Sequence, residues 1–94
     1  MSVDDSTLRR LRMRSMRRGM REMDLILSGW TETRLAELSA DEVATYEAFL
    51  SENDQDLYRW VSGQQSPPPA YADLVEDIVV VTEERARSSK THSI

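Results

Sequence analysis

The side chains best suited to specific recognition stand together at residues 17–24, which read Arg-Arg-Gly-Met-Arg-Glu-Met-Asp. A guanidinium group can bind a carboxylate through two parallel hydrogen bonds, and methionine side chains adapt to irregular surfaces. Glycine allows a tight turn and the close approach of another surface. The segment therefore fits an exposed protein-binding surface, and the alternative is a capped helix–turn–helix with ordinary surface charges.

The orientation of these side chains depends on whether a helix breaks at Gly19. On a continuous helix Arg18 and Glu22 would form an ion pair in the weaker order, with the base N-terminal to the acid. A glycine inside a helix costs about 1 kcal/mol relative to alanine, which favours a break. Arg18 and Glu22 would then flank a turn and face outward. Glu22 and Asp24 would lie in the first turn of the next helix, where carboxylates suit the helix dipole.

Composition excludes several kinds of catalytic site. The 94-residue chain has no cysteine and a single histidine, His92, near its C-terminal end. A disulfide scaffold, a cysteine nucleophile and a cysteine-bound metal are excluded, and a histidine-based triad or metal site is disfavoured. We find no nucleophile–base pair and no glycine-rich nucleotide loop, so we expect a protein that is not an enzyme and binds no cofactor or metal. Asp54 and Asp56 lack the glycine and final glutamate of a calcium loop, and we interpret them as helix-capping residues.

Helical periodicity predicts the elements that carry residues 17–24. Apolar residues at steps of three and four predict helices over about 6–17 and 20–36, although spacing alone also allows one long helix. The stripe comprises Met13, Met16, Met20, Met23, Leu27 and Trp30. Trp30 can either close the core or lie on the partner-binding face.

A second group of helices is predicted from capping signals. Residues 39–42, Ser-Ala-Asp-Glu, form a capping box that begins a helix of about 40–52. The turn at 53–56 begins a short helix that ends at Gly63. Four large residues at helical spacing are predicted to lie in the core: Tyr46, Phe49, Leu57 and Trp60.

The remaining chain completes an all-α fold, a small bundle of about five short helices. A stiff proline-rich linker spans 64–69, and the apolar pattern after it is helical. The β-branched run at 78–82 favours a strand by propensity, but no other segment offers a strand to pair with it. We predict a single domain over 1–94, with a folded core of about 6–86 and a flexible tail of 87–94.

Charge is distributed unevenly along the chain. Residues 1–21 carry seven arginines against two aspartates, a net charge of +5, whereas residues 22–94 carry five bases against fifteen acids, a net charge of −10. This split predicts either a basic arm for an anionic partner, such as a nucleic acid, or a basic helix that folds onto an acidic body.

No transmembrane or secretory segment is evident. The longest apolar run is only residues 78–81, and the N-terminus has no signal-peptide core. The arginine-rich start loosely resembles a mitochondrial transit peptide, but it runs directly into predicted helix. We therefore expect the bacterial cytoplasm, with the mitochondrial matrix as the alternative.

Residues 17–24 resemble the signature of the succinate dehydrogenase FAD assembly factor family. The family's core motif, Arg-Gly-x-x-Glu, is matched by Arg18, Gly19 and Glu22. The resemblance extends over about residues 9–82 in order and spacing. It includes the Leu-Ile-Leu that follows at 25–27, the capping element at 38–42, the Tyr-Glu-x-Phe-Leu helix at 46–50 and the Asp-x-Asp-Leu-Tyr-x-Trp-Val segment at 54–61.

The resemblance implies a five-helix assembly factor that binds the flavoprotein subunit of succinate dehydrogenase, with that of fumarate reductase as a further candidate. It would promote covalent attachment of FAD to a histidine of that subunit, without binding FAD itself. The primary candidate partner-binding residues are Arg18, Gly19 and Glu22, and the secondary ones are Arg17, Met20 and Asp24. We expect a monomer without nucleic-acid or membrane partners. An antitoxin role, also attributed to the family, a nucleic-acid-binding role and direct binding of free flavin remain alternatives.

Overall fold

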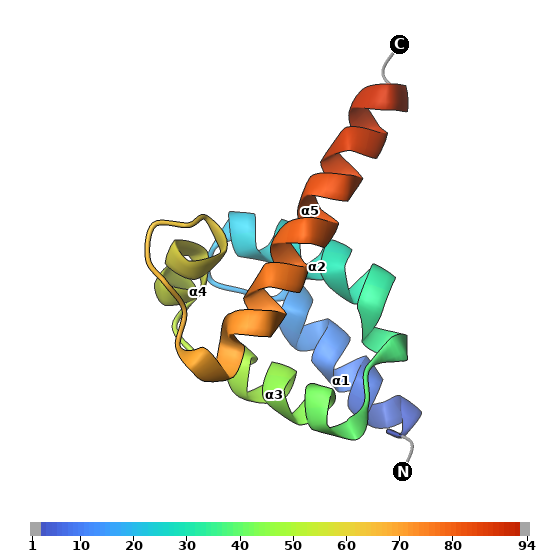
Figure 1. Cartoon of the computed structure of the whole chain (residues 1–94). Helices are drawn as coiled ribbons and strands as arrows, with labels where there is room; N and C mark the ends of the chain where they lie inside the picture. Colours follow the sequence, from blue (N-terminus) through green and yellow to red (C-terminus); the bar gives the residue numbers. More distant parts are fainter. Residues whose placement is uncertain (1–2, 93–94) are drawn as a thin grey trace.

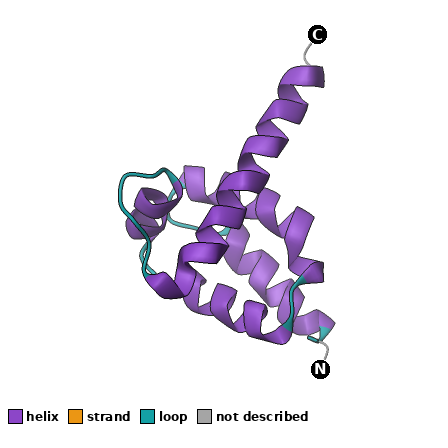
Figure 2. Ribbon diagram, viewed as in Figure 1, coloured by secondary structure: helices purple, strands orange, loops and turns teal. Residues whose placement is uncertain are grey.

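The computed structural model describes residues 3–92, with side chains through Ser88. All regular structure in this range is helical (Figures 1 and 2). The elements in chain order are α1 (Asp5–Met16), α2 (Arg21–Arg34), the 3₁₀ turn η1 (Leu35–Glu37), α3 (Ala40–Leu50), α4 (Asp54–Val61), the 3₁₀ turn η2 (Pro69–Tyr71) and α5 (Ala72–His92). The prediction of an all-α fold with about five helices is confirmed.

Helices α1, α3 and α4 begin where a side chain accepts from a free backbone N–H group. The Ser39 hydroxyl accepts from Glu42 N–H at 3.2 Å, and the Glu42 carboxylate accepts from Ser39 N–H at 2.8 Å, so both halves of the predicted capping box are present. Asn53 caps α4 by accepting from the N–H of Gln55. Gly63, with φ of +83°, lies just beyond the end of α4 in the left-handed region that favours glycine.

Helix α5 crosses over α2 in Figure 1, and its last turns project beyond the rest of the molecule. Helices α1 and α2 pack against each other, and α4 also contacts α5. The molecule is elongated, 43 × 28 × 23 Å, because of this projection. None of the described helices has a stretch long and apolar enough to cross a membrane.

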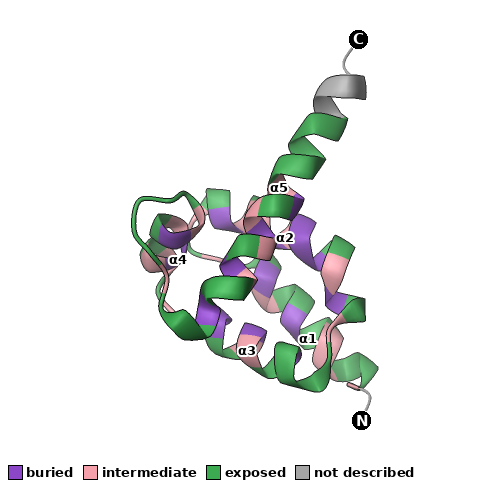
Figure 3. Ribbon diagram, viewed as in Figure 1, coloured by how far each residue is buried: buried purple, intermediate pink, exposed green. Residues whose placement is uncertain are grey.

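A single hydrophobic core joins all five helices, and Figure 3 shows the buried residues on their inward faces. It comprises Leu11, Met23, Leu27, Trp30, Leu35, Val43, Tyr46, Phe49, Leu50, Leu57, Trp60, Tyr71, Val75, Ile78 and Val81. Aromatic rings pack at its centre, with 4.6 Å between the ring centroids of Trp30 and Tyr46 and 5.5 Å between those of Phe49 and Tyr71. The four predicted core residues are confirmed, and Trp30, left open between core and surface, is 1% exposed.

The core contains one buried polar link between helices. The Ser15 hydroxyl donates to the carbonyl of Leu11, and its oxygen lies 2.6 Å from the Tyr46 hydroxyl, which is therefore the donor of that bond. Burial raises the pKa of Tyr46 to about 12. The link holds α1 against α3, and among the described residues every buried side-chain N or O atom has a hydrogen-bond partner.

Two further predictions concern the C-terminal part. Residues 78–82 are helical, and the strand favoured by their propensity is not formed, because the face with Tyr71, Val75 and Ile78 packs on the core. Of the predicted flexible tail, 87–94, the backbone through His92 continues α5. Residues 93 and 94 and the side chain of His92 lie outside the described part, and the flexibility of the tail stays a prediction.

Candidate functional site

The chain breaks between α1 and α2 at residues 17–20, here called the Gly19 turn. It leaves helical geometry at Arg17, with φ −124° and ψ 56°, and re-enters after Met20, with φ −132° and ψ 128°. The predicted break is confirmed, and Glu22 and Asp24 lie in the first turn of α2 as expected. Met20 caps α2 without a side-chain hydrogen bond, so other contacts must fix the turn.

The main contact comes from Asp54, the first residue of α4. One carboxylate oxygen, Oδ1, accepts from Arg18 Nε at 2.7 Å, and the other, Oδ2, accepts from Gly19 N–H at 2.8 Å. The side chains of Arg18 and Asp54 are only 9% and 20% exposed. Both charges are therefore largely removed from water and compensate each other. The pair is stable only while the two groups stay within hydrogen-bond distance, so it fixes the position of Arg18 relative to α4.

Two more hydrogen bonds complete the turn. The backbone N–H of Arg18 donates to the carboxylate of Asp24, and the Arg18 guanidinium Nη2 lies 3.4 Å from the carbonyl oxygen of Glu52. The turn is thereby tied to α2, to α4 and to the segment between α3 and α4. We infer that its backbone conformation is fixed in the free protein.

Glycine at position 19 lets the Asp54 carboxylate approach the backbone of the turn closely. A Cβ atom at this position would lie 3.2 Å from Asp54 Oδ2, closer than ordinary van der Waals contact. The φ angle of Gly19 is not positive, so the backbone itself does not demand glycine. The close approach that the sequence predicted for a partner surface is made here by Asp54.

A different group of side chains faces outward around the turn. Arg17, Arg21 and Glu22 are exposed and make no ion pair or side-chain hydrogen bond within the described residues. Leu25, one turn after Glu22 on the same face of α2, is the most exposed large apolar side chain of residues 3–88, at 64%. This outer face combines both charges with an apolar group, a combination suited to contact with another protein.

The six predicted site residues thus fall into two groups. Arg18 does not present an open fork to solvent, because its guanidinium group is bound by Asp54, and this corrects the expectation that it faces outward. Gly19 and Asp24 belong to the same bonded framework, and Met20 is half-buried against the core. Of the six, only Arg17 and Glu22 are exposed with side chains that have no partner among the residues the structure describes.

Sequence reasoning missed the role of Asp54, which was interpreted as a capping residue. Asn53 is the cap of α4, and the Asp54 carboxylate binds the Gly19 turn instead. The partners lie 35 and 36 residues apart, so local spacing carries no sign of the contact. Within the described residues no group of three or more histidine or acidic side chains could hold a metal ion.

Comparison with known proteins identifies the family to which most of the chain is similar. Residues 9–81 match the family model described as flavinator of succinate dehydrogenase. The chain is similar to proteins named succinate dehydrogenase assembly factor 2, mitochondrial, from Aspergillus flavus, Drosophila grimshawi and Arabidopsis thaliana. Identities are 36%, 37% and 34%, over 87%, 83% and 68% of this chain. The aligned parts make up 27%, 57% and 34% of these relatives, so the chain spans well under two thirds of their length.

These names agree with one expectation and leave another without support. Assembly factors are helpers of another protein's maturation, in line with the expectation of a protein that is not an enzyme. The relatives are mitochondrial by name, so the comparisons lend no support to the bacterial cytoplasm.

Proposed function

The chain belongs to the family of succinate dehydrogenase flavinators, and from this premise we propose that it binds the flavoprotein subunit of succinate dehydrogenase and promotes covalent attachment of FAD there. The observation that carries the proposal is the Gly19 turn, where bonded residues hold a backbone shape and Glu22 stands exposed beside it. The flavoprotein of fumarate reductase is a second candidate partner.

The two groups of residues suggest a division of labour in binding. Arg18, Gly19, Asp24 and Asp54 fix the turn before the partner arrives, so little conformational entropy is lost on docking. The exposed Glu22 accepts hydrogen bonds from backbone N–H or arginine groups of the partner. Arg18 then acts on the partner by holding the turn in shape.

The chemistry of flavin attachment belongs to the partner in this proposal. The factor favours a flavoprotein conformation in which the acceptor histidine and the flavin methyl group stand in reacting geometry. A ligand shifts such an equilibrium only by its differential affinity for the two conformations, so the factor must bind one of them more tightly. The factor itself binds no FAD, and titration of free FAD with the protein should leave flavin fluorescence unchanged.

The test is covalent flavin on the flavoprotein subunit, read by in-gel fluorescence after co-expression. We expect a strong signal with the wild-type chain and a signal near that of no factor with Glu22→Ala. Glu83→Ala is the matched control, because Glu83 is also exposed and has no partner in the described part of the chain, but lies on α5. Equal flavinylation in all of these samples, with all chains expressed, would falsify the proposal.

Two further properties remain part of the proposal. We expect a monomer that recognises a protein and not a nucleic acid or a membrane, and sedimentation and low-salt DNA-binding measurements check this. The bacterial cytoplasm stays our predicted location and the mitochondrial matrix the alternative, which fractionation of cells expressing the tagged chain distinguishes.

A further inference from the structure

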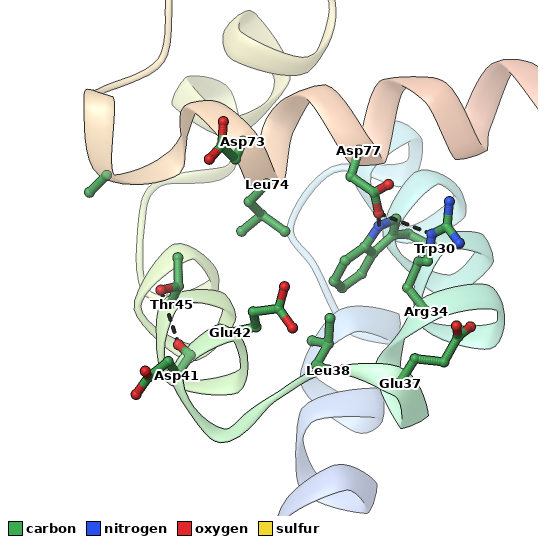
Figure 4. A pocket seen from close by; sticks show the side chains of 11 residues that line it. Trp30, Arg34, Glu37, Leu38, Asp41, Glu42, Thr45, Asp73, Leu74 and Asp77 are labelled. Carbon is green, nitrogen blue, oxygen red and sulfur yellow. Dashed lines mark hydrogen bonds and ion pairs between the residues drawn. The ribbon is translucent and has the colours of Figure 1, made fainter.

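A pocket of about 520 Å³ lies where the C-terminal end of α2, η1 and the first turns of α3 and α5 meet (Figure 4). Its volume is within the roughly 300–1,000 Å³ of typical ligand pockets. It lies at the far end of α2 from the Gly19 turn, since Arg34 follows Met20 by about 20 Å of helix rise. The proposed function makes no use of it.

The floor of this pocket is apolar and held in place. The apolar residues that line it are Trp30, Leu38, Leu74 and Ala70. Trp30 Nε1 donates to Asp77 at 2.9 Å, and Arg34 Nε donates to the same carboxylate oxygen at 3.2 Å. Figure 4 shows the indole and the guanidinium converging on Asp77. Asp77 is therefore neutralised, and the position of the indole ring is fixed.

The rim, by contrast, carries negative charge that the protein leaves unpaired. Glu37, Asp41 and Asp73 come from η1, α3 and α5, and their exposed side chains make no ion pair or hydrogen bond within the described residues. Glu42 points toward the middle of the pocket in Figure 4, and its Oε1 is held by the capping box. Acidic residues from three separate elements thus line one pocket that also has apolar side chains.

We propose that this acidic pocket, lined by the residues named above, docks a basic peptide segment of a partner protein in which arginine or lysine stands next to an aliphatic residue. The cationic group meets the rim carboxylates, and the aliphatic side chain covers Leu38 and Leu74. The pairing neutralises the rim carboxylates and removes apolar surface from water in one step.

Other occupants fit the lining less well. Phosphate-bearing ligands, including nucleotides and FAD, would meet carboxylates on three sides. A metal ion would need a cluster of ligands that the described residues do not form. A second copy of this chain could offer its own exposed arginines through reciprocal contacts between the basic and acidic parts of two copies, and sedimentation of the free protein tests this occupant.

The test uses a blocked seven-residue peptide that alternates arginine and leucine, with a second peptide in which serine replaces leucine. The protein carries Trp60→Phe, so that Trp30 in the pocket is the only tryptophan and reports binding by fluorescence. We expect the leucine peptide to bind at low salt. The affinity of the serine peptide should be lower by a factor of about five or more. Equal affinity of the two peptides would show simple charge attraction and overturn the proposal.

Two charge variants locate the site. Glu37→Gln, Asp41→Asn and Asp73→Asn together should weaken binding about tenfold, because three ion pairs are lost. The matched control changes the net charge equally at Glu76→Gln, Glu83→Gln and Glu84→Gln, exposed residues of α5 that do not line the pocket. It should weaken binding less than threefold. Similar losses in both triple variants contradict the proposal.

Amide chemical shifts of the unmodified protein provide a measurement that does not depend on the variants. The leucine peptide should shift signals of residues 34–45 and 70–77 and leave those of 17–24 in place. Shifts confined to the Gly19 turn, or no shifts, would overturn the assignment. Sedimentation of the free protein completes the test, because self-association abolished by the pocket triple variant would make a second copy the occupant instead.

Discussion

The two ends of α2 use their charges in opposite ways. At the N-terminal end, the carboxylates of Asp24 and Asp54 are bound within the chain and hold the Gly19 turn. At the C-terminal end, the rim of the acidic pocket keeps three carboxylates without a partner in the described residues. The charges at the N-terminal end fix the conformation of the Gly19 turn, whereas those at the C-terminal end are available for contact with another molecule.

Burial explains why the two arrangements differ in energy. The Arg18–Asp54 pair is mostly shielded from water, so loss of one partner leaves a charge that is neither solvated nor compensated. The rim carboxylates belong to exposed residues, so each can change at little cost. Stability measurements should therefore respond strongly at one end of α2 and weakly at the other.

The largest effect is expected from Asp54→Ala, which removes the partner of Arg18 and of the Gly19 N–H. We expect it to lower the free energy of unfolding by about 3 kcal/mol and Tm by roughly 10–20 °C. The matched change at the other end, Glu37→Ala, should stay within about 0.5 kcal/mol. Urea and thermal unfolding of both variants provide the measurement. Equal losses of unfolding free energy in the two variants would contradict the expected difference between the two ends of α2.

The second effect concerns Tyr46, which lies between the two ends. Its ring contacts Trp30 of the acidic pocket, and its hydroxyl donates to Ser15 of α1. Tyrosine ionises near pH 10 in the unfolded chain but near pH 12 in the fold, so its stabilising contribution is complete below pH 10 and is lost as the pH rises through 12. The expected loss is about 2–3 kcal/mol.

Tyr46→Phe isolates this contribution. At pH 7 the variant should be less stable by about 1 kcal/mol, since Ser15 keeps its bond to Leu11 and loses only the tyrosine. Between pH 10 and 12 its stability should fall less steeply than that of the wild type. Tyr71, whose pKa is also raised by burial and by Glu52, is present in both proteins and cancels. Parallel pH profiles of urea unfolding would contradict the assignment to Tyr46.

A smaller effect on stability is expected from substitution of Gly19, and substitution of Gly63 provides the comparison. Gly63→Ala forces a side chain into positive φ and should cost about 1–2 kcal/mol. Gly19→Ala adds a tight contact with Asp54 but also reduces the entropy of the unfolded chain, so the net change should be below about 1 kcal/mol.

Gly19→Arg should remain folded and fail to support flavinylation. Circular dichroism and in-gel flavin fluorescence distinguish these outcomes, and an unfolded Gly19→Arg protein would undercut the docking role.

The sequence predicted the helices well because their determinants are local. The capping box at Ser39 and Glu42, the break at Gly19 and the apolar spacing each act within a few residues. The same reasoning could not find the bond between Asp54 and Arg18, nor the meeting of Glu37, Asp41 and Asp73 around one pocket. These contacts join segments more than thirty residues apart and depend on how the helices pack, which local patterns do not encode.

The smallest effect on stability, and the sharpest test of the outer face, is expected at Leu25. Its side chain is 64% exposed, so Leu25→Ala should change the free energy of unfolding by less than about 0.5 kcal/mol. It lies one turn from Glu22, and an apolar anchor beside a charged contact commonly carries much of an interface's energy. If this face docks the flavoprotein, Leu25→Ala should raise the dissociation constant of the complex with the flavoprotein about tenfold relative to wild type. Val80→Ala, at a 42% exposed apolar position on α5, is the matched control and should leave binding unchanged. Calorimetry on the purified pair measures both, and equal affinities for the two variants would move the docking face away from the first turns of α2.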